Sequence, residues 1–310
     1  MKVAIVGAGH VGATLAYTLL LQDIVTRVSL IDVNPEKAVG EVLDLAHGAS
    51  YLDNIDIRAE GFDAVADADV IVITAGRGRQ PGESRLDLAR GNIAVLEEVL
   101  ADIAPHYRGA VVIVVSNPVD ILTYVAVKRL PVPAAKVIGA GTALDSSRFR
   151  YLLGREFGID PRSIHAYVVG EHGDSSVPVW SMANLGQIPV TRYVPPGGAA
   201  LDAEARARIH RAVIDAGKEV IRRKGATFYA VALSVARIVE AILHDEKSLL
   251  TVSTYIEHLH GVSDVCLSLP AVLGHEGVRE VLPIALDESE RQQLEASAAG
   301  LREMLRQLGY

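Results

Sequence analysis

The first 32 residues constrain this chain most, because they combine a short apolar run, a glycine-rich turn and an acidic residue at a fixed spacing. Val3–Val6 is apolar and precedes the sequence G-A-G-H-V-G over residues 7–12. A helical pattern continues to about Gln22, and a second apolar run ends at Asp32. This order predicts a strand, a tight turn, a helix and a second strand that ends in an acid.

Each part of this unit suits a dinucleotide. Gly7 permits a tight turn, Gly9 lets a pyrophosphate approach the backbone, and Gly12 lets the helix pack against the strand. The free N–H groups at the start of the helix attract phosphates. Asp32 lies 20 residues after Gly12, where a carboxylate accepts hydrogen bonds from a ribose and repels a 2′-phosphate. The stretch predicts an NAD-binding Rossmann unit that prefers NAD to NADP; tight turns without a ligand are the alternative.

The composition narrows the class of protein. The chain has 310 residues, of which 50% are hydrophobic, and its net charge of −8 comes without a Lys/Arg cluster, which argues against nucleic acid or an anionic membrane as a partner. The single cysteine, Cys266, excludes an intrachain disulfide and an all-cysteine metal site. The first strand begins by residue 3, and the apolar runs are shorter than the roughly 18 residues of a membrane helix. We therefore expect a cytoplasmic protein without a signal peptide or a membrane span.

Short β-branched runs alternate with helical patterns through the first 140 residues. Strands that are apolar throughout predict a parallel sheet covered on both faces, with the ligand at the carboxyl ends of the strands. From about Leu144 the pattern becomes mixed. We predict an α/β fold, with a doubly wound Rossmann sheet over residues 1–143 and a C-terminal α+β substrate domain over residues 144–310. The expected strands of the first part are Val3–Val6, Val28–Asp32, Ile55–Arg58, Val70–Thr74, Ala110–Ser116 and Lys136–Gly139.

Capping residues and periodicity place the other elements. Asn34 and Asp287 are the expected N-caps of two helices, and Glu290 completes a capping box with Asp287. Gly225 is expected to separate two helices. The expected helices are Pro35–Ala46, Leu86–Ile103, Ser146–Phe157, Ala203–Lys224, Thr227–His244 and one from Asp287, and the expected later strands are Ser163–Val169, Leu249–Ile256, Val265–Leu269 and Arg279–Ile284.

Two short segments carry candidate catalytic groups. His172 stands between Glu171 and Gly173 after a strand end, and an accessible imidazole suits proton exchange near neutral pH. An ordinary packed histidine is the alternative, since the chain has ten. Asp145 and Arg148 are three residues apart at a helix start and so share one face. Asp145 could orient an imidazole and Arg148 could grip a carboxylate, or Asp145 could be a simple N-cap.

Two loops at the same edge of the sheet could contact a ligand. Residues 75–85 hold three arginines among glycines, which indicates either a mobile cationic lid that closes over an anion or a solvated surface loop. Asn117 follows another strand in S-N-P. Its amide could bond a carbonyl group or start a turn.

Taken together, these motifs resemble those of the L-lactate/L-malate dehydrogenase family over nearly the whole chain, and most closely the bacterial L-lactate dehydrogenases. The resemblance implies that His172 is the acid/base with Asp145 as its partner, and that Arg148 holds the substrate's C1 carboxylate. The matching motifs are G-A-G-H-V-G, T-A-G-x-x-x-x-P-G-E-S-R, S-N-P-V-D, G-A-G-T-A-L-D-S-S-R-F-R, G-E-H-G-D-S and K-G-A-T-F-Y.

The same resemblance assigns the rest of the substrate pocket. Arg85 on the closing loop polarises the ketone, Asn117 touches nicotinamide and substrate, and Thr227 lines the pocket. Arg79 occupies the position that reads the far end of the substrate, where similar lactate enzymes usually have Gln and malate enzymes have Arg. A shift of the loop by one residue would bring Gln80 forward instead. Glu83 and Thr227, by contrast, look like the lactate type, so the sequence carries mixed signals about the substrate.

Two further residues resemble an effector site. Arg150 is two residues from Arg148 on a helix, and His165 is seven residues from His172 on a predicted strand, so both are expected to point away from the active site. In the bacterial lactate dehydrogenases, an Arg and a His at matching places bind fructose 1,6-bisphosphate between two subunits of a tetramer. The resemblance therefore implies a homotetramer with this allosteric effector, and a solvated Arg with a packed His is the alternative.

From the sequence we predict an NAD-dependent dehydrogenase of L-2-hydroxy acids, leaning to L-malate/oxaloacetate or to dual use with L-lactate/pyruvate. A strict L-lactate dehydrogenase regulated by fructose bisphosphate is one alternative. A non-catalytic NAD-binding regulator is another, and the complete catalytic set argues against it. An NAD-dependent glycosidase would want a metal site, and no Cys/His ligand cluster stands out, so we expect no metal.

Overall fold

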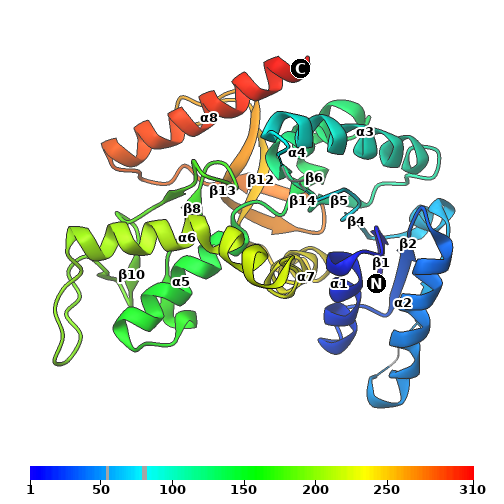
Figure 1. Ribbon diagram of the computed structural model, residues 1–310, viewed down its shortest axis with the longest axis horizontal. Coiled ribbons are helices and arrows are strands. Elements are labelled where there is room, and N and C mark those ends of the chain that lie inside the picture. The colour runs from blue at the N-terminus through cyan, green and yellow to red at the C-terminus, as the bar shows by residue number, and fades with distance from the viewer. Residues whose placement is uncertain (54–55, 79–81) are drawn as a thin grey trace.

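The computed structural model describes residues 1–53, 56–78 and 82–310. Its centre is one large sheet, nine-stranded within these residues, in the order β14-β13-β12-β6-β5-β4-β1-β2-β3 (Figure 1). The six strands of the first half run parallel, in the order expected of a Rossmann fold. They are β1 (Lys2–Val6), β2 (Arg27–Ile31), β3 (Asp56–Ala59), β4 (Val70–Ile73), β5 (Val111–Val114) and β6 (Val137–Gly139). The predicted α/β Rossmann sheet is confirmed.

The second half of the chain extends this same sheet. β12 (Ser248–Ile256) lies antiparallel to β6 through the pair Ser253 and Gly139, and β13 (Val265–Gly274) and β14 (Gly277–Val281) follow it as an antiparallel meander. The C-terminal half is thus α+β, as expected, but it shares a sheet with the first half. The division at residues 143/144 stays a prediction.

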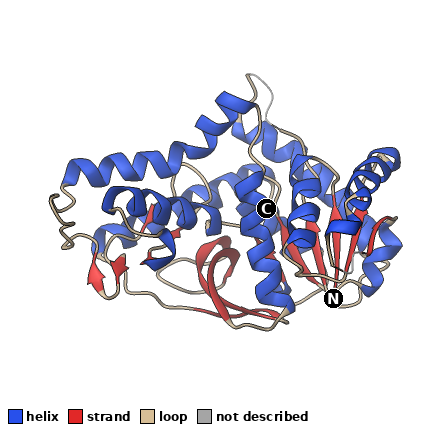
Figure 2. Ribbon diagram, turned by 90° about the horizontal axis from the view of Figure 1, so that it is seen from below, coloured by secondary structure: helices blue, strands red, loops and turns tan. Residues whose placement is uncertain are grey.

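Helices cover both faces of the sheet (Figure 2). One apolar core joins a sheet face to α3, α4 and α8, and the other joins the opposite face to α1 and α7. Within the described residues, no helix is both long and apolar enough to cross a membrane. The helices are α1 (His10–Leu21), α2 (Pro35–His47), α3 (Arg85–Ile103), α4 (Val119–Arg129), α5 (Ala143–Phe157), α6 (Ala203–Lys224), α7 (Tyr229–Leu243) and α8 (Glu288–Leu308), with short 3-10 turns η1 (Ala49–Tyr51), η2 (Phe62–Asp67), η3 (Ala134–Lys136) and η4 (Pro161–Ser163).

The predicted caps form. The Asn34 side chain accepts a hydrogen bond from Lys37 N at the start of α2, and Asp287 and Glu290 form a reciprocal capping box on α8. Gly225, with φ +85°, separates α6 from α7 in a conformation that favours glycine. Local chemistry therefore decides where these helices begin and end.

The prediction of one continuous strand over Ser163–Val169 is wrong. It is divided into β7 (Ile164–His165), which pairs with β10 (Asn184–Leu185), and β8 (Val168–Val169), which pairs with β9 (Val177–Pro178). The two strands belong to different small sheets, and β11 (Ile188–Pro189) completes the first of these. Pairing partners rather than local periodicity decide this break, so a strict strand alternation cannot relate His165 to His172.

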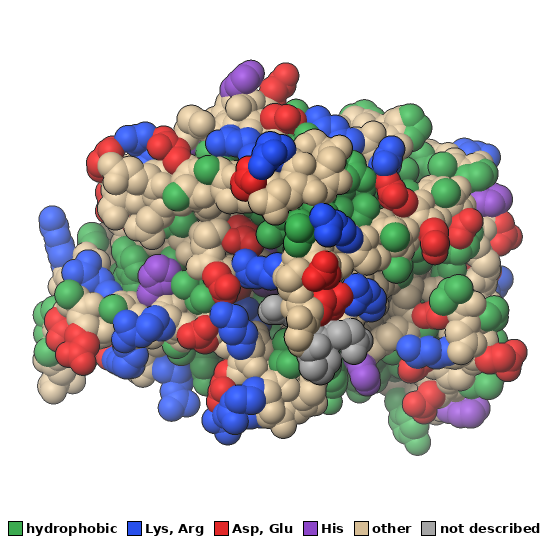
Figure 3. Space-filling model, turned by 45° about the horizontal axis from the view of Figure 1, so that its top comes forward, with side chains coloured by type: hydrophobic (Ala, Val, Ile, Leu, Met, Phe, Trp, Pro, Cys, Tyr) green, Lys and Arg blue, Asp and Glu red, His purple; other side chains and the backbone are tan. Residues whose placement is uncertain are grey.

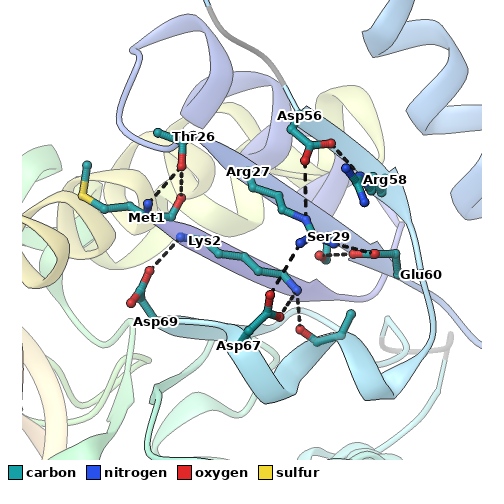
Figure 4. Close-up of polar contacts among 11 residues, drawn as sticks. Met1, Lys2, Thr26, Arg27, Ser29, Asp56, Arg58, Glu60, Asp67 and Asp69 are labelled. Carbon is teal, nitrogen blue, oxygen red and sulfur yellow. Dashed lines mark hydrogen bonds and ion pairs between the residues drawn. The ribbon is translucent and has the colours of Figure 1, made fainter.

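Charged side chains form hydrogen bonds and ion pairs with one another at the amino ends of β1, β2 and β3 (Figure 4). Lys2 donates from Nζ to the Ala64 carbonyl at 2.6 Å and pairs with Asp67. Arg27 pairs with Glu60 at 2.7 Å. Over the face in Figure 3, basic and acidic side chains are also interleaved.

Candidate active site

The glycine-rich turn joins β1 to α1 beside β4. Gly7 has φ +112°, and a Cβ there would lie 2.7 Å from both Ala75 N and Thr74 Oγ1. A Cβ on Gly12 would lie 1.8 Å from the Gly7 carbonyl oxygen. At Gly9, by contrast, a Cβ would meet no atom of the described residues within 4 Å. Gly7 and Gly12 therefore allow close packing, while Gly9 faces open space where a pyrophosphate can approach the backbone.

Asp32 is positioned at the end of β2 next to this turn. Its two carboxylate oxygens accept hydrogen bonds from Ala8 N at 2.7 Å and Asn34 N at 2.9 Å. These bonds fix the carboxylate beside the start of α1, where the ribose of a bound dinucleotide would lie. The residues present thus fit NAD: the turn and α1 would hold the pyrophosphate, and Asp32 would hold the ribose.

His172, Asp145 and Arg148 form one hydrogen-bonded group. His172 Nδ1 lies 2.5 Å from Asp145 Oδ2, and Arg148 NH1 donates to Asp145 Oδ1 at 2.8 Å. Asp145 is buried one turn inside α5, which begins at Ala143, so it is not the N-cap. The carboxylate therefore orients both cationic side chains, and Nδ1 of the imidazole is already engaged.

The electrostatics of this pair favour a charged imidazole. Burial lowers the pKa of His172, but the charge and hydrogen bond of Asp145 outweigh it, and the pKa lies above the usual histidine value. Burial likewise raises the pKa of Asp145, but His172 and Arg148 outweigh it, and the pKa lies below the usual value. His172 thus suits a general acid near neutral pH.

Asp120 is a buried carboxylate beside His172 that the sequence analysis did not single out. It lies in the first turn of α4, only 2% exposed, and accepts hydrogen bonds from His172 N at 2.8 Å and Ser253 Oγ at 2.6 Å. Burial raises its pKa to about 6, against the effect of these hydrogen bonds. The carboxylate ties the His172 backbone to α4 and β12. The S-N-P-V-D motif contains Asp120, but the sequence analysis took only Asn117 from it and did not predict α4.

The loop after β4 is anchored by a different arginine from the one expected to act on the substrate. Arg77 pairs with Glu83 at 2.5 Å, and its guanidinium lies where a Cβ on Gly91 would be 2.3 Å away. Arg85, the first residue of α3, instead faces the His172 loop, with ion pairs to Glu171 at 3.6 Å and Asp174 at 3.3 Å. Arg77 therefore fixes the base of the loop, and Arg85 lies beside the segment that carries His172.

A buried amide connects this loop to Asn117. Asn92 Oδ1 accepts from Arg77 N at 2.9 Å, and Asn92 Nδ2 donates to the carbonyls of Arg77 at 3.1 Å and Asn117 at 2.6 Å. Asn117 and His172 line one small cavity. Thr227 precedes Phe228, whose ring stacks on His10 with centroids 5.2 Å apart, so the segment between α6 and α7 reaches the glycine-rich turn. Thr227 lies outside α7, which begins later than expected.

Other predicted residues lie apart or are not described. Arg79 and Gln80 fall outside the described residues. Arg150 is half-buried on α5, and burial lowers its pKa, while His165 is exposed on β7, against which α5 packs. Among the described residues one group could hold a metal, at Glu240, His244 and Glu246, but Arg237 already pairs with both carboxylates, at 3.2 and 2.5 Å.

The comparisons with known proteins agree with this geometry. A family model described as the lactate/malate dehydrogenase NAD binding domain matches residues 1–139, and one described as the lactate/malate dehydrogenase alpha/beta C-terminal domain matches residues 142–308. The chain belongs to the lactate/malate dehydrogenase family. It is therefore an NAD-dependent oxidoreductase that acts on 2-hydroxy acids.

Similar proteins in this family carry the lactate dehydrogenase name. An L-lactate dehydrogenase of Acetivibrio thermocellus is 45% identical over 99% of this chain and 97% of its own length. One of a Synechococcus species is 44% identical over 98% of each chain. The solved structure of the minor L-lactate dehydrogenase of Enterococcus mundtii has a TM-score of 0.95 and 36% identity, and covers 99% of this chain and 98% of its own. A lactate dehydrogenase from a deep-sea metagenome of the Medee basin has a TM-score of 0.96 and 37% identity, and covers 100% of this chain and 99% of its own.

Proposed function

We propose that this dehydrogenase interconverts L-lactate with pyruvate and L-malate with oxaloacetate. The observation that supports it best is the His172–Asp145–Arg148 group, in which one carboxylate orients an imidazole and a guanidinium side by side. An imidazole exchanges protons with a hydroxyl or ketone oxygen, and a guanidinium binds a carboxylate with two hydrogen bonds. A 2-hydroxy acid carries both groups on adjacent carbons.

In the direction of reduction, His172 acts as the general acid. Its Nδ1–H donates to Asp145, which leaves Nε2–H to deliver a proton to the ketone oxygen. When bound, NADH supplies the hydride that reduces C2 of the substrate. Asp145 stabilises the imidazolium before the transfer, and in the oxidation direction neutral His172 takes the proton back.

The residues around His172 bind the substrate, and two arginines among them supply positive charge to its carboxylate and its ketone oxygen. Arg148 holds the C1 carboxylate through the N–H groups that do not bond Asp145. Arg85 polarises the ketone from the loop end of α3, next to the His172 loop. Asn117 contacts substrate and nicotinamide in the shared cavity, and Thr227 closes the pocket from the segment before α7.

Two signals support the use of both substrates. The relatives named L-lactate dehydrogenase support pyruvate. Arg79, at the position that reads the far end of the substrate, supports oxaloacetate, because it offers a charge to the second carboxylate. With pyruvate, the same arginine would lie beside a methyl group, and an unpaired enclosed charge costs several kcal/mol. Glu83 adds a negative charge to this loop that would offset part of that cost, although it already pairs with Arg77.

A comparison of kcat/KM for pyruvate and oxaloacetate tests this proposal. We expect the wild type to reduce both acids and Arg79→Gln to raise the pyruvate/oxaloacetate ratio. Arg77→Gln is the matched control, because it removes an arginine of the same loop that pairs with Glu83, and should change both substrates alike. An unmoved ratio in Arg79→Gln would leave a strict lactate dehydrogenase. NADH binding without turnover of either acid would indicate a regulator instead.

We further propose that Arg150 and His165 bind fructose 1,6-bisphosphate between subunits of a homotetramer. Within the described residues Arg150 makes no ion pair or hydrogen bond, and it lies half-buried next to the element that carries exposed His165. The bisphosphate should lower the apparent KM, because it binds one quaternary state better than the other. Substrate titrations of wild type and Arg150→Gln test this; identical curves with and without effector would exclude the site.

A further inference from the structure

A small cavity lies beside His172, between the carboxyl ends of β5 and β6 and the helix α7. Most of its wall is apolar, and includes Val115 and Val231. Three polar side chains also line it: Asn117, His172 and Ser234. An aromatic ring with one polar substituent matches such a wall, since most of the surface is apolar and a few polar groups are in place to orient it.

Ser234 stands out among these three, because its hydroxyl has no hydrogen-bond partner among the residues that the structure describes. Its Oγ is buried and forms no hydrogen bond within the described part of the chain. Other hydroxyls on helices of this protein donate to the carbonyl four residues back: Thr14 to His10, Thr18 to Thr14 and Thr123 to Val119. Ser234, on the interior of α7, does not use that option. A buried polar group without a partner is destabilising, so its presence calls for an explanation, such as a functional role or a bound group that supplies the missing hydrogen bond.

We propose that the Ser234 hydroxyl hydrogen-bonds the carboxamide group of the nicotinamide ring. A carboxamide offers an acceptor oxygen and two N–H donors, and a hydroxyl can serve either. In this arrangement the ring lies against the apolar wall formed in part by Val115 and Val231, with its carboxamide turned toward Ser234 on α7. This bond fixes the rotation of the ring, and so decides which of its faces is turned toward His172. The assignment rests on the use of NAD and not on which acid is the substrate.

Equilibrium binding to Ser234→Ala tests the assignment without a turnover measurement. Kd is measured for NADH and for ADP-ribose, which has the pyrophosphate and both riboses but no nicotinamide. We expect Ser234→Ala to weaken NADH by about threefold to tenfold, the usual effect of one neutral hydrogen bond, and to leave ADP-ribose unchanged. Thr18→Val is the matched control, because it removes a satisfied helical hydroxyl, and should change neither ligand.

An analogue with an acetyl group in place of the carboxamide locates the lost bond. The analogue keeps the carbonyl oxygen but has no N–H donors. If Ser234 accepts from the amide, the wild type binds the analogue more weakly than NADH and Ser234→Ala binds both alike; if it donates to the carbonyl, the alanine variant weakens both. Unchanged NADH affinity in Ser234→Ala, or an equal loss for ADP-ribose, would overturn the proposal.

Discussion

At the amino end of β1, Lys2 is enclosed by the Ala64 carbonyl and Asp67 (Figure 4). The carboxyl end of the same strand instead leads into a glycine-rich turn whose Gly9 faces open space. β2 repeats the contrast. It begins at Arg27, paired with Glu60, and ends beside Asp32, whose carboxylate is held by backbone N–H groups next to that turn. The same two strands thus hold charge differently at their two ends.

The difference shows what makes one end a binding site. At the amino end, each of these charged groups is bonded to another group of the protein, and the Lys2 side chain among them is only 7% exposed, so a substitution there acts on stability. At the carboxyl edge of the same sheet, where β6 leads into α5, the buried carboxylate of Asp145 bonds both His172 and Arg148, and Nε2 of His172 remains for a ligand. Substitutions at the two ends should therefore separate activity from stability.

The largest effect is expected from His172→Asn. The variant loses the general acid, so kcat for 2-oxo acid reduction should fall by about 10²–10⁴. The Kd of NADH, measured by fluorescence titration, should hardly change, because the glycine-rich turn and Asp32 are untouched. An asparagine variant with wild-type kcat would contradict the assignment of the acid.

Asp145→Asn should change the pH dependence as well as the rate. Pyruvate reduction uses protonated His172, so kcat/KM falls as the pH rises through the raised pKa of His172. Removal of the Asp145 charge lowers that pKa, and the falling limb moves to lower pH. For lactate oxidation, which uses the neutral form, the rising limb moves the same way. Profiles that scale down in rate without moving along the pH axis would leave Asp145 a purely structural role.

Lys2→Met should affect stability rather than catalysis. The Lys2 side chain is only 7% exposed, and its loss leaves the Ala64 carbonyl without a donor, which costs about 1–3 kcal/mol. Urea denaturation measures this loss, and kcat/KM at 25 °C should stay at the wild-type value. Arg58→Met, which breaks an exposed pair with Asp56 at the same end, is the control and should change stability very little. A large loss of activity in Lys2→Met would break the contrast between the two ends.

Gly91→Ala should affect catalysis less than the substitutions at His172 and Asp145. Its new Cβ would meet the Arg77 guanidinium at 2.3 Å and displace it from the base of the loop, so kcat/KM should fall severalfold. Gly300→Ala is the matched control in α8, where a Cβ meets no described atom within 4 Å. That substitution should stabilise the protein by about 0.5–1 kcal/mol without a change in kcat/KM. Equal kinetics in both variants would show that Arg77 does not hold the loop.

Local signals in the sequence determined the first half of the fold and the candidate catalytic residues. The spacing of Gly7, Gly9 and Gly12 and the apolar strands predicted the Rossmann sheet, because a parallel strand buried on both faces has few other patterns. The caps at Asn34 and Asp287 bond partners only three residues further along the chain, and both formed as predicted. Such information is contained in neighbouring residues.

Tertiary structure decided what depends on residues far apart in the chain. Asp120 lies 52 positions before His172 and meets its backbone only because α4 packs against β12 and β13. The pairing of β12 with β6, and the break between β7 and β8, likewise follow from which edges come together. A buried polar group finds its partner through packing, and one residue's neighbours in sequence do not reveal which distant group will satisfy it.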